Sequence, residues 1–177
     1  GIGNVCRARG EYTEALGYYQ RSLAISKEIN DRIGKRIGTL NIGHIHTRTG
    51  QYDQALSYHR DSLNEAQESG ERVGETVAYN NLGCVCYLTG KYDEARRHLE
   101  LGLVIAREIG YRIGVGRCLS NIGGIYYARE EYDQALDHFQ RGPTLAQEVG
   151  DRAGEGILLH NMGLVHDSKG ALEQAFG

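Results

Sequence analysis

Apolar residues recur along the chain at the spacing of amphipathic helices. Between residues 52 and 63 they fall at i, i+3, i+4 and i+11, which is one stripe of a helix with 3.6 residues per turn: Tyr52, Ala55, Leu56 and Leu63. A second stripe precedes it and carries Ile33, Ile37 and Leu40. The pattern therefore predicts two helices in succession, the first ending near residue 50 and the second near residue 70.

The same pattern returns every 40 residues without a gap. The stretches "NIGHIHTRTGQYDQAL", "NLGCVCYLTGKYDEAR", "NIGGIYYAREEYDQAL" and "NMGLVHDSKGALEQAF" begin at residues 41, 81, 121 and 161. Such a period is typical of a solenoid, in which each unit buries its apolar face against its neighbours. We predict an all-α fold with a single solenoid over residues 1–177. Its divisions are a partial repeat 1–30, whole repeats 31–70, 71–110 and 111–150, and a partial repeat 151–177.

Glycine columns mark the expected helix ends. The second helix of each unit should stop at Asn30, Gly70, Gly110 or Gly150, because Gly and Asn tolerate the left-handed conformation that closes a helix. The first helix should stop at Gly50, Gly90 or Gly170, with the start of a second helix from Ala171. Glu130 occupies that column in one unit, so we expect a less regular turn there.

Two further columns concern the inside of the helices. A glycine recurs within the first helix, at Gly43, Gly83, Gly123 and Gly163. Since Gly costs roughly 1 kcal/mol relative to Ala in a helix, its recurrence indicates a close approach between helices. In the second helix the column Leu23, Leu63, Leu103 continues with Pro143, which predicts a kink or break near residues 139–143.

Composition narrows the function classes. The net charge is −3 and charges of both signs are interspersed, which argues against a nucleic-acid or anionic-membrane surface. No apolar run approaches the ~18 residues of a membrane span, and no signal-peptide pattern is present. Cys84 and Cys86, two apart on a helix, cannot easily form a disulfide, so we expect free thiols and a cytoplasmic location. The chain begins with Gly1, which we interpret as a segment of a longer protein.

The repeat unit resembles the tetratricopeptide repeat. Asn-Leu/Ile-Gly-x-x-Tyr followed by Gly-x-Tyr-x-x-Ala-Leu is similar to that family's pattern, and Ile122, Gly123, Tyr126, Ala135 and Phe139 fall at its spacings. The period of 40 is similar to the subclass of the Pins/LGN scaffolds and of many bacterial signalling proteins. The resemblance implies a right-handed α-α superhelical solenoid of antiparallel helix pairs.

Metal ligation is the first chemical interpretation to weigh. His44 and His46 align with Cys84 and Cys86, and all four are zinc-ligand types. Residues two apart on a helix diverge, however, and equivalent positions of neighbouring units should lie roughly 8–10 Å apart. We therefore predict no metal and no cofactor. No nucleophile recurs beside a base, so we also predict that the chain is not an enzyme.

The resemblance places a binding groove along the first helices of successive units. Projected onto this sequence, the groove comprises Asn41, His44, Arg48, Asn80, Asn81, Tyr87, Arg117, Asn121, Tyr127, His160 and Asn161. The Asn column at 41, 81, 121 and 161 either forms a ladder that bonds a peptide backbone or braces neighbouring helices. The expected ligand is an extended or helical segment of a partner protein.

These observations leave two main functional hypotheses. The first is a non-catalytic protein–protein interaction scaffold, with no nucleic-acid or membrane partner. The alternative is a regulatory or sensor array of a larger enzyme or signalling ATPase whose catalytic domain lies outside these residues. A purely structural spacer is disfavoured by the Asn column. Because the chain begins and ends within a repeat, we also expect exposed apolar end faces and self-association through them.

Overall fold

The computed structural model describes the backbone of residues 1–176 and the side chains of residues 1–143 and 146–170, and every regular element in that span is an α-helix. In chain order the helices are α1 (Ile2–Ala8), α2 (Tyr12–Glu28), α3 (Arg32–Arg48), α4 (Tyr52–Ser69), α5 (Arg72–Leu88), α6 (Tyr92–Glu108), α7 (Arg112–Ala128), α8 (Tyr132–Gln140), α9 (Pro143–Glu148) and α10 (Arg152–Phe176).

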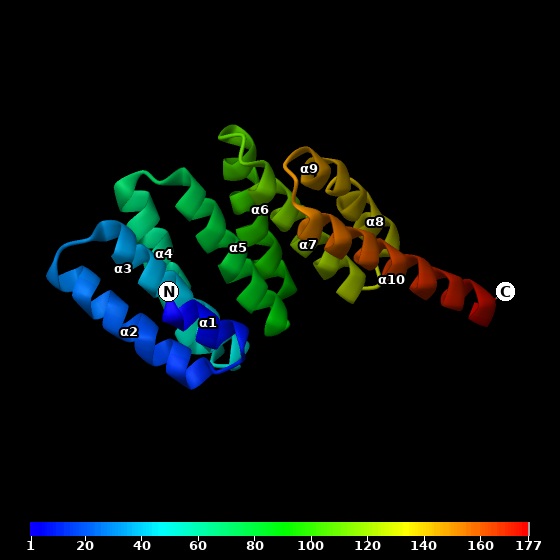
Figure 1. Ribbon diagram of the computed structural model, residues 1–177. Coiled ribbons are helices and arrows are strands. Elements are labelled where there is room, and N and C mark those ends of the chain that lie inside the picture. The colour runs from blue at the N-terminus through cyan, green and yellow to red at the C-terminus, as the bar shows by residue number, and fades with distance from the viewer. Residues whose placement is uncertain (177) are drawn as a thin grey trace.

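From α1 to α8 each helix packs against the next in an antiparallel arrangement, and α10 packs against α7, α8 and α9 (Figure 1). The chain runs from α1 and α2 at one end of the row to α10 at the other. The molecule is thus a right-handed α-α superhelical solenoid, as the sequence predicted. Among residues 1–176, no helix combines the length and the apolar character that crossing a bilayer requires.

The turns close on residues with positive φ. Asn30, Gly70, Gly110 and Gly150 adopt φ of 55°, 70°, 68° and 73°, which confirms the predicted helix ends. Glu130 adopts φ 61°, and its N–H donates to the carbonyl of Tyr127 at 2.9 Å, as Gly90 does to Tyr87 at 3.0 Å. The expectation of a less regular turn at Glu130 is therefore wrong, since the packing of α7 on α8 imposes the same geometry on a less suitable residue.

A second expectation about turns is also wrong. Helix α10 continues through Gly170 to Phe176, and no second helix begins at Ala171. Other units place a polar residue and a tyrosine directly after this position, as in Gln51-Tyr52 and Lys91-Tyr92, whereas this unit has Ala171 and Leu172. Both are strong helix formers, so the helix propagates where the other units turn.

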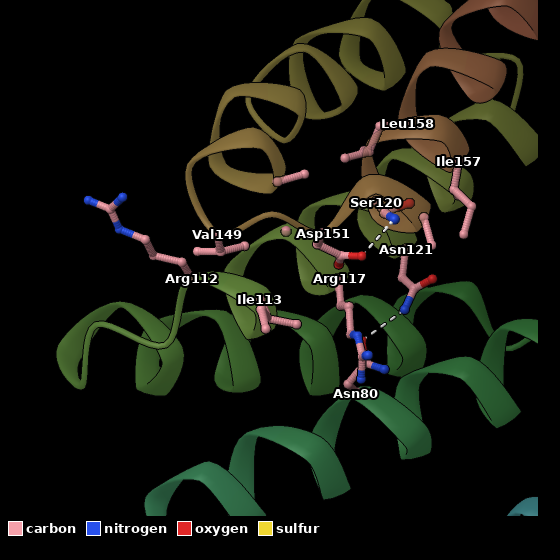
Figure 2. A pocket seen from close by; sticks show the side chains of 14 residues that line it. Asn80, Arg112, Ile113, Arg117, Ser120, Asn121, Val149, Asp151, Ile157 and Leu158 are labelled. Carbon is pink, nitrogen blue, oxygen red and sulfur yellow. Dashed lines mark hydrogen bonds between the residues drawn. The ribbon is translucent and has the colours of Figure 1, made fainter.

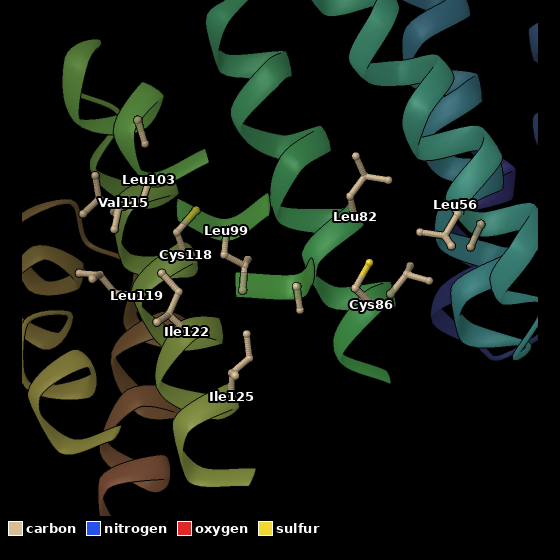
Figure 3. Close-up of a cluster of buried hydrophobic side chains, with 14 residues drawn as sticks. Leu56, Leu82, Cys86, Leu99, Leu103, Val115, Cys118, Leu119, Ile122 and Ile125 are labelled. Carbon is tan, nitrogen blue, oxygen red and sulfur yellow. The ribbon is translucent and has the colours of Figure 1, made fainter. Parts of the chain in front are cut away.

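The core is a row of buried aliphatic side chains between successive helices. Its central cluster includes Leu82 and Val85 of α5, Leu99 of α6 and Ile122 of α7, all at most 2% exposed (Figure 3). Burial of each such side chain contributes about 1.5–3 kcal/mol.

The glycine column explains how closely the helices of a pair approach. A Cβ on Gly83 would lie 2.6 Å from Leu99 Cγ, and one on Gly123 would lie 2.6 Å from Phe139 Cε1. A Cβ on Gly43 would lie 2.7 Å from His59 Cε1. The predicted packing role is confirmed at these positions and is wrong at Gly163, where nothing lies within 4 Å because no described helix covers that face of α10.

The predicted break at Pro143 is present. Helix α8 ends at Gln140 and α9 begins at Pro143, where the missing N–H of proline costs no helical hydrogen bond. Gly142 between them is buried, and a Cβ there would lie 2.5 Å from Leu158 Cδ1 of α10. The break allows α9 to pack against both α7 and α10.

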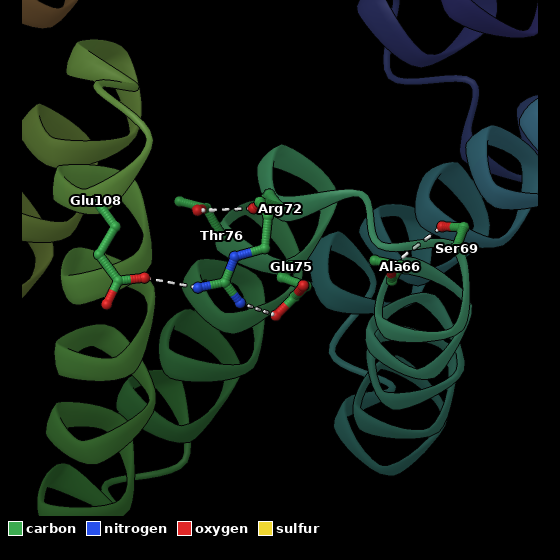
Figure 4. A network of polar contacts seen from close by, with 6 residues as sticks. All are labelled: Ala66, Ser69, Arg72, Glu75, Thr76 and Glu108. Atoms are coloured by element: carbon green, nitrogen blue, oxygen red, sulfur yellow. Dashed lines mark hydrogen bonds and ion pairs between the residues drawn. The ribbon is translucent and has the colours of Figure 1, made fainter.

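Ion pairs join helices both within a repeat and between neighbouring repeats. Arg72 donates to Glu75 at 3.0 Å in its own helix and to Glu108 of α6 at 2.7 Å (Figure 4). The pairs Arg129–Asp93 and Lys169–Asp133, both at 2.7 Å, also connect residues 36 apart. Such exposed pairs contribute little free energy, about 0–1 kcal/mol each, and their main effect is to fix the register between units.

Candidate functional site

Four cavities follow one face of the solenoid. The Arg48 cavity, of about 570 Å³, lies between α1, α3 and α5, and its lining includes Arg7, His44, Arg48 and Asn81. The Asn81 cavity, of about 80 Å³, continues it between α3, α5 and α7. These two cavities share His44 and Asn81.

The other two cavities extend along α7 to α10. The Arg117 cavity, of about 380 Å³, lies between α5, α7, α9 and α10 (Figure 2) and shares Asn80 and Arg117 with the Asn81 cavity. The Tyr127 cavity, of about 480 Å³, shares Ser120, Asn121 and Ile157 with the Arg117 cavity. Because each cavity shares residues with the next, the four form one continuous concave surface, which we call the groove.

Most of the residues predicted from the sequence line this groove. They are His44, Arg48, Asn80, Asn81, Tyr87, Arg117, Asn121, Tyr127 and Asn161. Asn41 and His160 line none of the four cavities. Asn41 aligns with Gly1, where α1 is only beginning, so no helix forms an opposite wall at that level. His160 is exposed on α10, which no later described helix faces.

The Asn column connects adjacent first helices through side chains. Asn121 Nδ2 donates to Asn80 Oδ1 at 2.8 Å (Figure 2) and also to Cys84 Sγ at 3.3 Å. Asn81 Nδ2, in contrast, is shielded from solvent and has no hydrogen-bond partner among the described residues. Among the described residues, bracing between units by hydrogen bonds that the Asn amide donates is therefore present at one position of the column, Asn121, and it uses side chains.

The charge in the groove is positive although the chain is acidic overall. Arg7 and Arg117 are exposed and form no ion pair with any carboxylate whose side chain the structure describes. Arg48 donates only to the hydroxyl of Tyr12, at 3.3 Å. Among the residues that line the four cavities, Asp151 is the single carboxylate, and its Oδ1 accepts from Gly154 N–H at 2.9 Å as an N-cap. The groove thus favours a negatively charged ligand.

Two half-buried titratable side chains of the groove, His44 and Cys84, are held neutral. Burial lowers the pKa of His44, the Asn81 side chain opposes this as a hydrogen-bond acceptor, and Arg7 and Arg117 lower the pKa further. Burial raises the pKa of the Cys84 thiol to about 11, so it carries no charge near pH 7. These groups can donate and accept hydrogen bonds, and neither is activated as a nucleophile.

The His-x-His and Cys-x-Cys pairs lie as the helix geometry required. His44 faces the groove, with its ring centroid 5.6 Å from that of His59. His46 is buried on the other side of α3 and stacks on Tyr58 at 5.3 Å. The same division separates Cys84 from the fully buried Cys86, and all four cysteines are free thiols.

Some groove residues were absent from the sequence prediction. Ile157 occupies the column of Arg117 in the next unit, so extending that column by 40 residues would have found it. Val149 gave no such signal, since its position depends on the helix break at Pro143. Arg7 belongs to the short α1, whose packing on α2 brings it to the Arg48 cavity.

Comparison with solved structures shows the same architecture. Aspartyl phosphate phosphatase F from Bacillus subtilis is 17% identical with a TM-score of 0.85, and the match covers 98% of this chain and 46% of that one. A Rap protein complexed with competence and sporulation factor is 14% identical with a TM-score of 0.84, covering 98% and 48%. A signal transduction ATPase with a tetratricopeptide repeat sensor from Pyrococcus horikoshii is 21% identical with a TM-score of 0.71, covering 90% and 25%. The chain spans half or less of the length of these three proteins.

Family comparison identifies the repeats themselves. No curated protein matches the chain in sequence. Family models described as tetratricopeptide repeat match residues 1–33, 35–108, 90–148 and 114–176, which is nearly the whole chain. The chain belongs to the tetratricopeptide repeat family.

Proposed function

We propose that the chain is a non-catalytic interaction scaffold that holds an extended, acidic peptide segment of a partner protein in the groove. The observation that carries this proposal is the continuity of the four cavities across five helices, α1, α3, α5, α7 and α10. Packed helices lie roughly 10 Å apart, which matches about three residues of extended chain at ~3.3 Å each. One repeat of the protein therefore serves about three residues of the ligand.

The lining of the groove specifies the chemistry of that segment. Arg7 and Arg48 at one end and Arg117 in the middle favour carboxylate side chains. The Tyr127 cavity offers apolar surface instead, with Leu88 at 50% and Leu164 at 38% exposed. A peptide with acidic residues followed by an apolar anchor satisfies both regions.

Two of the comparisons support peptide binding by this architecture. One matching Rap protein is complexed with competence and sporulation factor, and another is in complex with the Phr* peptide. Both are 14% identical to this chain, so they support the fold's capacity for such ligands and not a particular peptide.

The assignment as non-catalytic rests on the groove itself. One structural neighbour is named a phosphatase, and at 17% identity that likeness concerns the fold alone. In the groove the Cys84 thiol is neutral and Asp151 is engaged as a helix cap, which leaves neither as an activated nucleophile or base. The proposal is therefore a binding function.

The alternative function is a sensor array of a larger signalling ATPase. It is favoured by the match to the Pyrococcus horikoshii protein, of which the corresponding segment is a quarter of the chain. The groove would have the same role in that case, and peptide binding would control nucleotide hydrolysis elsewhere. Measuring the effect of a bound peptide on ATP hydrolysis by the full-length protein separates the two.

Peptide binding can be tested with fluorescein-labelled probes of about 12 residues, long enough to cross four repeats. A Glu/Leu peptide should bind with micromolar affinity and a Lys/Leu peptide of the same length should not. Arg7→Ala and Arg117→Ala should each weaken binding by roughly tenfold, because each removes a charge-assisted contact. Arg107→Ala is the matched control, since Arg107 is an exposed arginine on α6 outside the groove. Equal binding of the two peptides, or an equal loss with Arg107→Ala, would refute the proposal.

A further inference from the structure

Three donor side chains of different chemistry meet between α5 and α6, outside the groove. A ligand atom from each of Cys86, Glu94 and His98 lies within 4.8 Å of the other two. Cys86 is a fully buried free thiol, while the side chains of Glu94 and His98 are 36% and 23% exposed. Sulfur, oxygen and imidazole nitrogen are the three ligand types that zinc takes in proteins.

Neighbouring units show what these positions do elsewhere. In the preceding unit, His46 and Tyr58 occupy the positions of Cys86 and His98, and their rings stack with centroids 5.3 Å apart. In the following unit the same two positions hold Tyr126 and His138, whose ring centroids lie 5.1 Å apart. The ordinary role of this pair is therefore ring-to-ring packing between the two helices of a repeat.

The unit 71–110 departs from this arrangement at two of the three positions. A thiol replaces the first ring at Cys86, so His98 has no ring there to stack on. Glu94 occupies a position that is glutamine in both neighbouring units, at Gln54 and Gln134. Both changes replace a packing or neutral group with one that can become an anionic metal ligand.

His98 is in a state that suits coordination. Its Nδ1 is shielded from solvent and has no hydrogen-bond partner, and its Nε2 lies 3.9 Å from a carboxylate oxygen of Glu94. An unpartnered imidazole nitrogen of this kind is a ligand atom that Zn²⁺ takes in proteins.

We propose that Cys86, Glu94 and His98 bind a Zn²⁺ ion, with water as the fourth ligand. Ligand atoms of a tetrahedral zinc site lie about 3.5 Å apart, so the donors must move inward by about 1 Å. Rotation of the two partly exposed side chains, Glu94 and His98, can supply that movement. On binding, the Cys86 thiol loses its proton to solvent and the thiolate coordinates the ion, so affinity falls as the pH is lowered.

The nearby cations set the charge balance of the site. Arg60, Arg97 and Lys91 act on His98 or Cys86 and oppose a bound cation. The thiolate and the Glu94 carboxylate supply two negative charges that neutralise Zn²⁺ itself. A bound ion would connect α5 to α6 in the central repeat, where the neighbouring repeats use a pair of contacting rings.

A second group of donors provides an internal comparison. Cys6, Glu11 and Glu14 also lie within 4.8 Å of one another, on α1 and α2. This group has no histidine, and both of its carboxylates are on exposed residues. It carries no proposal and serves as the control site.

Cobalt titration of the reduced, full 177-residue chain tests the site, because a thiolate bound to Co²⁺ gives a charge-transfer absorption in the near ultraviolet. We expect one equivalent with this absorption and its displacement by Zn²⁺. Cys86→Ser should abolish the absorption, and Glu94→Gln and His98→Gln should each weaken Co²⁺ binding by at least about tenfold. Cys6→Ser, Cys118→Ser and His138→Gln should change nothing.

Two outcomes would overturn the proposal. One is the absence of a sulfur-to-cobalt absorption in the folded chain, and the other is an absorption that Cys6→Ser removes while Cys86→Ser does not. Glu94→Gln keeps the test valid if Cys86→Ser fails to fold. Because Glu94 is partly exposed, the circular dichroism of Glu94→Gln should be the same as that of the original chain. Zn²⁺ should also raise the melting temperature of the original chain and not of Glu94→Gln.

Discussion

His59 occupies a position that other units fill with a larger ring or an aliphatic side chain, at Tyr19, Leu99 and Phe139. It is 1% exposed, its Nε2 lies 3.3 Å from Thr47 Oγ1, and its Nδ1 has no partner. Since Thr47 Oγ1 donates to the carbonyl of Gly43, Nε2 must carry the proton and donate to Thr47. Burial, with a smaller effect from His44, lowers the pKa of His59 to about 3.

The neutral state of His59 predicts loss of stability in acid. In the unfolded chain this histidine takes up a proton near pH 6.5, whereas in the folded chain it does so only near pH 3. The contribution of neutral His59 to the free energy of unfolding is therefore complete above pH 6.5 and is lost as the pH falls toward 3. Each pH unit in this window costs up to about 1.4 kcal/mol. The free energy of unfolding measured in urea should be lower at pH 5 than at pH 7 by up to about 2 kcal/mol. His59→Leu should reduce this fall and the exposed-site control His160→Gln should not; an unchanged fall in His59→Leu would contradict the assignment.

Asn121 and Asn161 share a column and differ in their bonds. Asn121 donates to Asn80 and Cys84, whereas Asn161 lines the Tyr127 cavity with no hydrogen bond among the described side chains. We predict that Asn121→Ala lowers the free energy of unfolding by about 1 kcal/mol and that Asn161→Ala leaves it nearly unchanged. Melting temperature and affinity for the Glu/Leu peptide should be measured together for both variants and for Asn81→Ala. Lost affinity at unchanged melting would assign the column to recognition instead of bracing.

At the scale of the helices, two glycines of the same column allow the effect of close helix packing to be distinguished from that of helix propensity. A Cβ on Gly83 would lie 2.6 Å from Leu99 Cγ and 3.1 Å from the carbonyl oxygen of Ala95, whereas Gly163 faces open space. Gly83→Ala should therefore destabilise the protein by about 1–3 kcal/mol through overpacking. Gly163→Ala should stabilise it by about 0.5–1 kcal/mol through helix propensity. Denaturant unfolding compares the two, and equal effects of the same sign would show that close packing is not the cause.

The helices and most of their ends could be predicted because they depend on a local period. The errors occurred where one residue type was taken to decide a turn. Glu130 adopts a left-handed conformation without being glycine, because the helices on both sides fix it. Gly170 lies inside a helix, because no helix packs back against α10 there among the described residues. Whether a turn forms in this fold thus depends on the packing of the two helices that it joins, and the residue type at one position is not sufficient to predict it.

For the molecule as a whole, the groove could be predicted where a repeat lies on each side. Residues such as Asn81 and Arg117 were found by register alone. Asn41 and His160 line none of the four cavities, because each would need a facing helix that the described residues do not supply. The triad of Cys86, Glu94 and His98 was also missed, because alignment compared Cys86 with Cys84 on its own helix, while its neighbours come from α6.

Self-association is predicted from the uncovered face of α10. Leu119 is 2% exposed, and Leu159, its equivalent 40 residues later, is 53% exposed. We expect the 177-residue chain to pair through this surface, with a molecular mass by light scattering that rises with concentration. Leu159→Lys should shift the chain toward the monomer. Leu101→Lys is the control, since Leu101 is 49% exposed on α6. A clean monomer at high concentration would contradict the prediction.

The ion pairs between helices of the same or neighbouring repeats have a kinetic consequence. Arg72–Glu108, Arg129–Asp93 and Lys169–Asp133 each close a loop of 36 residues, and no ion pair among the described side chains spans more. The entropy of loop closure therefore does not grow with the length of the solenoid. We expect folding to nucleate in any repeat and to propagate to its neighbours, at a rate set by one repeat pair and not by the number of repeats.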